Sequence, residues 1–306
     1  MRDGRISNWM QIASLRRYTL TEGAEKGLDV IDCANGNIRF LVNVSKACDI
    51  MQTYYRGENV SFVSKNGFTA RETPFLKRFE GGMLYTCGLD SLDEREGFET
   101  HGGFHNTPAS IKSVSCDEKG IMIEAQIVFT ELCGQNLVVR RRITSALNSD
   151  SVSVEDTLLN AGYTAEQYCL LYHINIGYPL LDEGGRIIAD LRAYEPRTDW
   201  ATKNIEKAFL IENPVPQAEE MCYYLYLNKP EISYINEKTG KKLTLTYSGE
   251  TLHHFVEWKN MLCGDYALGI EPCTTEFDDR FKYSVLEPNE EAHFRVELRI
   301  EQVLER

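Results

Sequence analysis

The sequence predicts an all-β protein, a large antiparallel β-sandwich with few short helices. Two observations support this prediction: β-rich runs recur along the chain, and turn signals rather than helical periodicity separate them. A third is length, because 306 residues without a linker-like segment suffice for one large β domain. We therefore expect residues 1–306 to form a single domain.

The expected strands are short segments rich in β-branched and aromatic residues. In 121–129, apolar residues occupy every second position, as in a half-buried strand. Turn sequences such as CDEKG at 116–120 and NEKTG at 236–240 are typical of antiparallel hairpins. A short helix is expected around residues 8–17. The strands are predicted at 37–44, 121–129, 136–145, 151–159, 167–176, 221–227, 241–247, 253–259, 265–271 and 293–304.

The charge balance argues against several classes of partner. The chain has 33 basic and 46 acidic residues, and its net charge of −13 disfavours nucleic acid and anionic membrane surfaces. No run approaches the roughly 20 apolar residues that span a bilayer, and the first residues lack the apolar centre of a signal peptide. We expect a cytoplasmic protein, and a homo-oligomer is compatible with the sequence.

Two further patterns concern cysteines and arginines. The nine cysteines include no CxxC pair, which favours reduced, mostly buried thiols over disulfides or a zinc site. The basic run Arg140 to Arg142 lies in an expected strand, whose side chains alternate between faces. A solvated strand face is the simpler interpretation of this run, and an anion site is the alternative.

Residues 66–110 interrupt the regular pattern. They show no strong periodicity but contain six aromatic residues. An irregular stretch of this length in a compact domain usually has a functional role. We expect it to be ordered and to form one wall of a site.

The segment EQYCLLYHINIGYP, residues 166–179, is predicted to be a buried strand that carries two polar residues on one face. Strand periodicity places His173 and Asn175 together, opposite Tyr172 and Ile174. A single buried histidine is most often a satisfied core residue. Two adjacent polar side chains on one face both need partners, and this favours a functional role.

A carboxylate is the second candidate. In GDYALGIEPCTTE, residues 264–276, alternation places Glu271 on one face with Gly269. The small residue leaves open space beside the carboxylate, where a ligand could lie. A solvent-exposed strand end is the alternative interpretation, and Pro272 is expected to end the strand.

The glycine-rich loop THGGFHNTPAS, residues 100–110, contains His101 and His105. With His173 and Glu271 they could be ligands of a metal ion. The loop lacks the HExxH spacing that holds two histidines on one helix face, so a polar loop closing over a substrate is preferred.

An aromatic residue is the fourth candidate. In HHFVEWKN, residues 253–260, Trp258 could stack on the apolar face of a sugar or pack in the core. No Walker loop, GxGxxG or GxSxG motif occurs, so nucleotide binding and α/β-hydrolase chemistry have no support.

Taken in order, these motifs resemble the aldose 1-epimerase (mutarotase) superfamily, and most of all its uncharacterised bacterial branch. The similarity runs over roughly residues 10 to 300. The matching segments are ACDIMQTYYRGENVSFVS, FLKRFEGGMLYTCGLD, THGGFHNTPA, YHINIGYPLL and EWKNMLCGDYALGIEPCT.

The resemblance implies a galactose-mutarotase-like β-supersandwich with an open cleft, a small sugar as substrate and no cofactor. By the matching motifs, Glu271 would be the base on the anomeric hydroxyl and His173 the acid on the ring oxygen, on opposite sides of the reacting bond. His101 would be a second sugar-contacting histidine of the catalytic group. The candidates for substrate binding are Asn175, Arg78, Asn106, Lys259, Trp258, Asp49 and His105.

Two departures from the family pattern keep alternatives open. Lys46 and Gly103 stand where this branch tends to carry arginine, and lysine lacks the planar fork of a guanidinium. The alternatives are a carbohydrate-binding protein without catalysis and a metal-dependent sugar isomerase or lyase.

Overall fold

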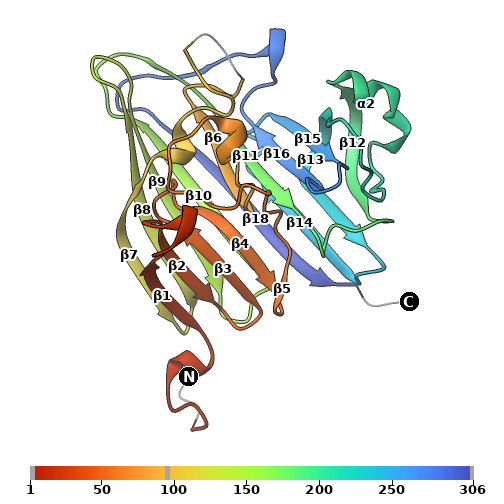
Figure 1. Cartoon of the computed structure of the whole chain (residues 1–306). Helices are drawn as coiled ribbons and strands as arrows, with labels where there is room; N and C mark the ends of the chain where they lie inside the picture. Colours follow the sequence, from red (N-terminus) through yellow and green to blue (C-terminus); the bar gives the residue numbers. More distant parts are fainter. Residues whose placement is uncertain (1–3, 94–96, 304–306) are drawn as a thin grey trace.

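The computed structural model describes residues 4–93 and 97–303, and this part of the chain is mostly β structure (Figure 1). Its strands form a five-stranded and a 13-stranded antiparallel sheet. The predicted all-β fold with large antiparallel sheets and few short helices is confirmed.

The smaller sheet comes from the N-terminal part of the chain. Its strands follow one another in sequence order, as in a meander, and it lies against one face of the larger sheet (Figure 1). The strands are β1 (Ser14–Thr19), β2 (Asp29–Ala34), β3 (Ile38–Asn43), β4 (Asp49–Tyr55) and β5 (Glu58–Asn59).

The larger sheet has the order β17-β11-β16-β15-β13-β14-β18-β10-β9-β8-β7, with β6 also paired to β11 and β12 to β13. Its strands are β6 (Leu84–Leu89), β7 (Ala109–Asp117), β8 (Gly120–Thr130), β9 (Asn136–Ala146), β10 (Ser151–Asn160), β11 (Glu166–Ile176), β12 (Arg186–Pro196), β13 (Met221–Asn236), β14 (Lys241–Tyr247), β15 (His254–Asn260), β16 (Ala267–Cys273), β17 (Ser284–Leu286) and β18 (Glu291–Gln302).

Helices are short. The α-helices within residues 4–93 and 97–303 are α1 (Phe75–Arg78) and α2 (Asp199–Lys203). The 3-10 helices are η1 (Trp9–Gln11), η2 (Gly23–Glu25), η3 (Phe104–Asn106), η4 (Ile205–Lys207) and η5 (Asp278–Arg280). Among the residues described, no helix is long and apolar enough to cross a membrane.

Each of the ten predicted strands overlaps an observed strand, but three local predictions were wrong. The helix expected around 8–17 is only the turn η1, and β1 begins at Ser14. The irregular stretch contains β6, whose six residues are all buried and therefore show no alternation. β16 continues through Pro272, which pairs with Phe255 of β15.

Alternating side chains of β11 belong to two different apolar clusters. Tyr172 and Ile174 lie in the main core, which contains residues of both sheets. Leu171 and Cys169 lie in a second cluster on the opposite face, formed with residues of β6, β13, β15 and β16. The predicted division of this strand into two faces is confirmed, and the second cluster underlies the site described below.

A buried charge network connects the two sheets. Arg141 of β9 is 1% exposed and binds Asp156 of β10 through two hydrogen bonds of 2.9 and 2.7 Å. A third nitrogen donates to Asp49 of β4, at 2.5 Å. Burial opposes ionisation of Asp49, but Arg141 and His105 outweigh it and lower the pKa of its carboxyl group.

The solvated-face interpretation of the arginine run was therefore wrong for its middle residue. Arg140 and Arg142 are about half exposed, with side-chain exposures of 54% and 50%, and they pair with surface glutamates. Arg141 points to the other face because side chains alternate along a strand. None of the nine cysteines, which all lie in the described part of the chain, forms a disulfide bond.

Replacing Arg141 with alanine should leave the buried carboxylates of Asp49 and Asp156 without their cation. We expect the free energy of unfolding in urea to fall by about 3–5 kcal/mol. Arg140→Ala and Arg142→Ala, on the same strand but exposed, should each cost less than about 1 kcal/mol. An Arg141→Ala variant no less stable than these two controls would contradict the role of the network.

Candidate active site

A cavity of about 1030 Å³ opens over the face of the sheet that carries the second apolar cluster. Four of the ten predicted site residues line it: His101, His173, Trp258 and Glu271. They come from the glycine-rich loop, β11, β15 and β16. Segments far apart in the sequence therefore meet at one place.

Strand register brings three of these residues onto one face. β16 lies between β11 and β15, with Glu271 opposite Val256 and Gly269 opposite Trp258. His173 lies on the neighbouring strand β11, which pairs with β16 on the other side. Because side chains alternate along each strand, His173, Glu271 and Trp258 all point into the cavity.

The histidine and the glutamate contact one another directly. His173 Nε2 lies 3.2 Å from Glu271 Oε1, and the side chains are only 4% and 3% exposed. The expected arrangement, with the two groups on opposite sides of a bound ring, is thus not present. Both side chains line the same side of the cavity, so a ligand that contacts both has to lie over the pair.

Gly269 makes this contact sterically feasible. A Cβ atom at this position would lie 2.2 Å from Glu271 Oε1 and 3.1 Å from His173 Cε1. The open space that the sequence predicted beside Glu271 exists, but the pair itself occupies it. The glycine therefore sets the position of the carboxylate against the imidazole.

Burial controls the protonation of the pair. It raises the pKa of Glu271 well above the ordinary value for a glutamate, with a further contribution from Glu220. It lowers the pKa of His173 well below the ordinary value for a histidine, and His101 adds to this shift. An ion pair would lower the pKa of the glutamate and raise that of the histidine, but the cost of burying charge is the larger effect on both groups. Burial therefore favours the neutral form of each group, a carboxylic acid on Glu271 and a neutral imidazole on His173.

Two polar atoms of the pair are available to a ligand. His173 Nδ1 and Glu271 Oε1 are buried and form no hydrogen bond with a described residue, although Oε1 lies 3.2 Å from His173 Nε2. Unsatisfied buried polar atoms are uncommon in folded proteins and usually have a functional explanation. Their presence on the floor of a cavity indicates a binding site for a polar molecule.

Aromatic rings surround the pair. The ring centroids of His101 and Trp258 lie 5.4 and 5.5 Å from that of His173. Phe79, which follows α1, lies 5.5 Å from His173 and 6.3 Å from Trp258. Burial lowers the pKa of His101 to about 4, so this side chain is neutral near pH 7. The expectation that the irregular stretch forms one wall of the site is consistent with Phe79 and His101 lining the cavity.

Several cavity residues were missed from the sequence. Trp258 Nε1 donates to Glu220, 2.9 Å away, and Arg197 binds Asp278 at 2.8 Å. Lys65 pairs with Asp265 at 2.6 Å. Most of these residues lie in loops or beside strand ends, where no local periodicity indicates which way a side chain points.

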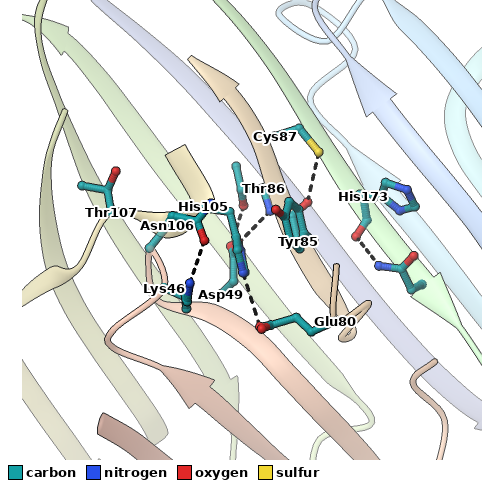
Figure 2. A network of polar contacts seen from close by, with 12 residues as sticks. Lys46, Asp49, Glu80, Tyr85, Thr86, Cys87, His105, Asn106, Thr107 and His173 are labelled. Atoms are coloured by element: carbon teal, nitrogen blue, oxygen red, sulfur yellow. Dashed lines mark hydrogen bonds and ion pairs between the residues drawn. The ribbon is translucent and has the colours of Figure 1, made fainter. Parts of the chain in front are cut away.

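Three predicted binding residues lie outside the cavity, in a polar network around β6 (Figure 2). His105 lies between two carboxylates, with Nδ1 2.6 Å from Asp49 and Nε2 3.3 Å from Glu80. Its ring stacks on Tyr85 at a centroid distance of 3.6 Å. Asn106 accepts a hydrogen bond from Lys46 at 2.6 Å. His105 and Asp49 thus support Tyr85, the β6 residue opposite His173 in the ladder.

The other three predicted binding residues also lie outside the cavity lining. Arg78 binds the carbonyl of Thr73 and the carboxylate of Glu99. Lys259 lies on the opposite face of β15 from Trp258 and donates to backbone carbonyls, including that of Leu210 at 3.0 Å. The side-chain nitrogen of Asn175 donates to the carbonyl of His173 at 3.1 Å.

The side chains considered as metal ligands are not arranged as a metal site in the described part of the chain. In residues 4–93 and 97–303, no three His, Cys, Asp or Glu side chains are arranged to hold a metal ion. His105, one of the four residues considered for this role, is engaged by Asp49 and Glu80.

His101, His105 and His173 should differ in charge near pH ~6.5, the ordinary pKa of the histidine side chain. Burial opposes protonation of His105, but hydrogen bonds to Asp49 and Glu80 outweigh it and raise its pKa. We expect ring ¹⁵N shifts to show His105 protonated, and His101 and His173 neutral. Because its folded-state pKa is raised, His105 stabilises the fold fully below about pH 6.5 and loses this contribution as pH rises through that pKa. A His173 that titrates near pH 6.5 would contradict the buried pair.

Comparison with solved structures confirms the fold. A candidate aldose 1-epimerase from Klebsiella pneumoniae subsp. pneumoniae MGH 78578 has a TM-score of 0.83 at 19% identity, over 94% of this chain and 83% of that one. For a galactose mutarotase-like protein from Clostridium acetobutylicum the TM-score is 0.71 at 13% identity, with 96% and 100% covered. A galactose mutarotase related enzyme from Lactobacillus acidophilus has a TM-score of 0.62 at 12% identity, over 95% of this chain and 99% of that one.

At these identities the similarity establishes the fold, which is the galactose-mutarotase-like sandwich that the sequence motifs implied. A comparison with curated proteins finds no matching sequence. A family model described as a domain of unknown function, DUF4432, matches residues 25–300. The chain therefore belongs to the DUF4432 family.

Proposed function

We propose that the protein is an aldose 1-epimerase-like enzyme that interconverts the anomers of a free sugar. The observation that carries this proposal is the buried contact between His173 and Glu271 on the floor of an aromatic-walled cavity. Anomer exchange requires one proton to leave the anomeric hydroxyl and one to reach the ring oxygen. A carboxyl group and an imidazole can supply both transfers.

The neutral pair starts the reaction with a proton on Glu271. His173 takes the proton of the anomeric hydroxyl while Glu271 gives its proton to the ring oxygen. The bond between the anomeric carbon and the ring oxygen breaks, its electrons stay on that oxygen, and a carbonyl forms at the anomeric carbon. The carbonyl group then rotates, and the same transfers in reverse close the ring as the other anomer.

The pair carries one exchangeable proton in either protonation form. After ring opening the proton lies on His173 and the carboxyl group is ionised, so ring closure uses Glu271 as base and His173 as acid. The assignment for ring opening is the reverse of the one that the family motifs imply, in which Glu271 is the base on the anomeric hydroxyl and His173 the acid on the ring oxygen. The two forms differ only in which group holds the proton, so a full cycle neither gains nor loses protons.

The cavity walls suit a sugar. Trp258 and Phe79 lie 6.3 Å apart at an interplanar angle of 89°, so their rings form two sides of a corner next to His173. An apolar ring face packs well against the C–H groups of a pyranose. Glu220, held by Trp258, offers a carboxylate to hydroxyl groups.

Removing either reacting group should abolish most of the activity. We expect Glu271→Gln and His173→Gln each to lower kcat for anomer interconversion more than ~100-fold, as for a general acid or base. Saturation-transfer NMR over a panel of free hexoses measures the exchange directly. His293→Gln, which replaces a histidine of β18 outside the cavity, is the control and should keep wild-type kcat.

Two results would overturn the proposal. One is the absence of acceleration for every hexose in the panel with folded protein present. The other is a Glu271→Gln variant with wild-type kcat. Sugar binding in calorimetry without any turnover would indicate a carbohydrate-binding protein instead.

A further inference from the structure

We infer that this cavity selects uncharged sugars and rejects sugar phosphates and uronic acids. The inference rests on the proposed function and adds the charge class of the substrate to it. Three observations carry it: the excess of acidic residues in the lining, the pairing of both basic residues, and the neutral state of the histidines.

Acidic side chains outnumber basic ones around the cavity. The described lining contains two basic residues, Lys65 and Arg197. The lining also contains the carboxylates of Asp93, Glu220, Asp265 and Asp278, besides Glu271, whose neutral form burial favours. A concave surface with an excess of one charge raises the local concentration of ligands of opposite or no charge over ligands of like charge.

Both basic residues are already neutralised. Lys65 binds Asp265 at 2.6 Å, and Arg197 binds Asp278 through two hydrogen bonds of 2.8 and 2.9 Å. Arg197 also lies 3.4 Å from Asp93. A phosphate or carboxylate that approached either cation would have to displace a carboxylate that remains in the cavity.

The remaining polar groups offer no positive charge. Burial keeps His101 and His173 neutral, since it lowers the pKa of both. Glu220 hydrogen-bonds to Trp258 and has no cationic partner in the part of the chain that the structure describes. A second anion next to this carboxylate would be repelled, whereas a hydroxyl group could donate to it.

The contact between Lys65 and Asp265 provides the sharpest test. The lysine side chain is 66% exposed and so has room to move toward a ligand, while Asp265 is 21% exposed. Asp265→Asn removes the carboxylate that holds the lysine. The freed ammonium group can then bind a phosphate, so this single change should relax the selection against anions.

A matched control exists elsewhere on the surface. Asp182 pairs with Lys238 at 2.8 Å, with side-chain exposures of 25% and 62%. Neither residue lines the cavity. Asp182→Asn therefore makes the same change in net charge and breaks the same type of ion pair away from the site.

The experiment measures kcat/KM for anomer exchange and Kd by calorimetry for D-glucose and D-galactose, their 6-phosphates and their uronic acids. We expect the neutral sugars to exceed their anionic forms at least about 10-fold in kcat/KM, and the difference to narrow as added salt screens the cavity. Asp265→Asn should raise the kcat/KM of the sugar phosphate relative to that of the neutral sugar several-fold. Asp182→Asn should leave this ratio unchanged.

The inference fails if a phosphate or uronic acid equals or exceeds its neutral parent, or if Asp265→Asn changes the ratio no more than Asp182→Asn. It also fails if no sugar of either class binds. Selective binding of neutral sugars without anomer exchange would overturn the proposed function but support the charge selection. The two failures are therefore distinguishable.

Discussion

The contact between His173 and Glu271 depends on one small residue in β16, the strand that carries Glu271. Gly269 leaves room for the carboxylate to lie back over β16 and reach the imidazole on β11. Any side chain at this position would occupy the space that Glu271 now fills. Burial of the pair then favours its neutral form, which keeps one exchangeable proton on the floor of the cavity.

The fold keeps the buried ion pairs that stabilise it apart from the polar groups that line the cavity. Arg141, Asp49 and Asp156 are fully enclosed between the two sheets, where each charge has a partner. On the other face of β11, His173 Nδ1 and Glu271 Oε1 form no hydrogen bond with a described residue. A buried network with every charge paired holds the scaffold rigid, and the unpaired atoms are kept for a ligand.

Strand alternation predicted much of the fold and the centre of the site. His173, Glu271 and Trp258 lie on the faces that period two assigned to them, since both neighbouring ladders keep their register there. The same rule places Lys259 on the face of β15 opposite Trp258, so the absence of Lys259 from the cavity was foreseeable. The roles of Arg141 and His105 were not foreseeable, because Asp49, the partner that both contact, lies 92 and 56 residues away in the sequence. β6 escaped detection because a strand buried on both faces has no polar alternation.

The account rests on a sugar lying over the pair, and a crystal structure of Glu271→Gln with a bound hexose tests this most directly. We predict the anomeric oxygen and the ring oxygen within hydrogen-bond distance of residues 173 and 271, with the sugar ring packed against Trp258. A hexose bound elsewhere, with His173 and residue 271 still closed against each other, would contradict the account.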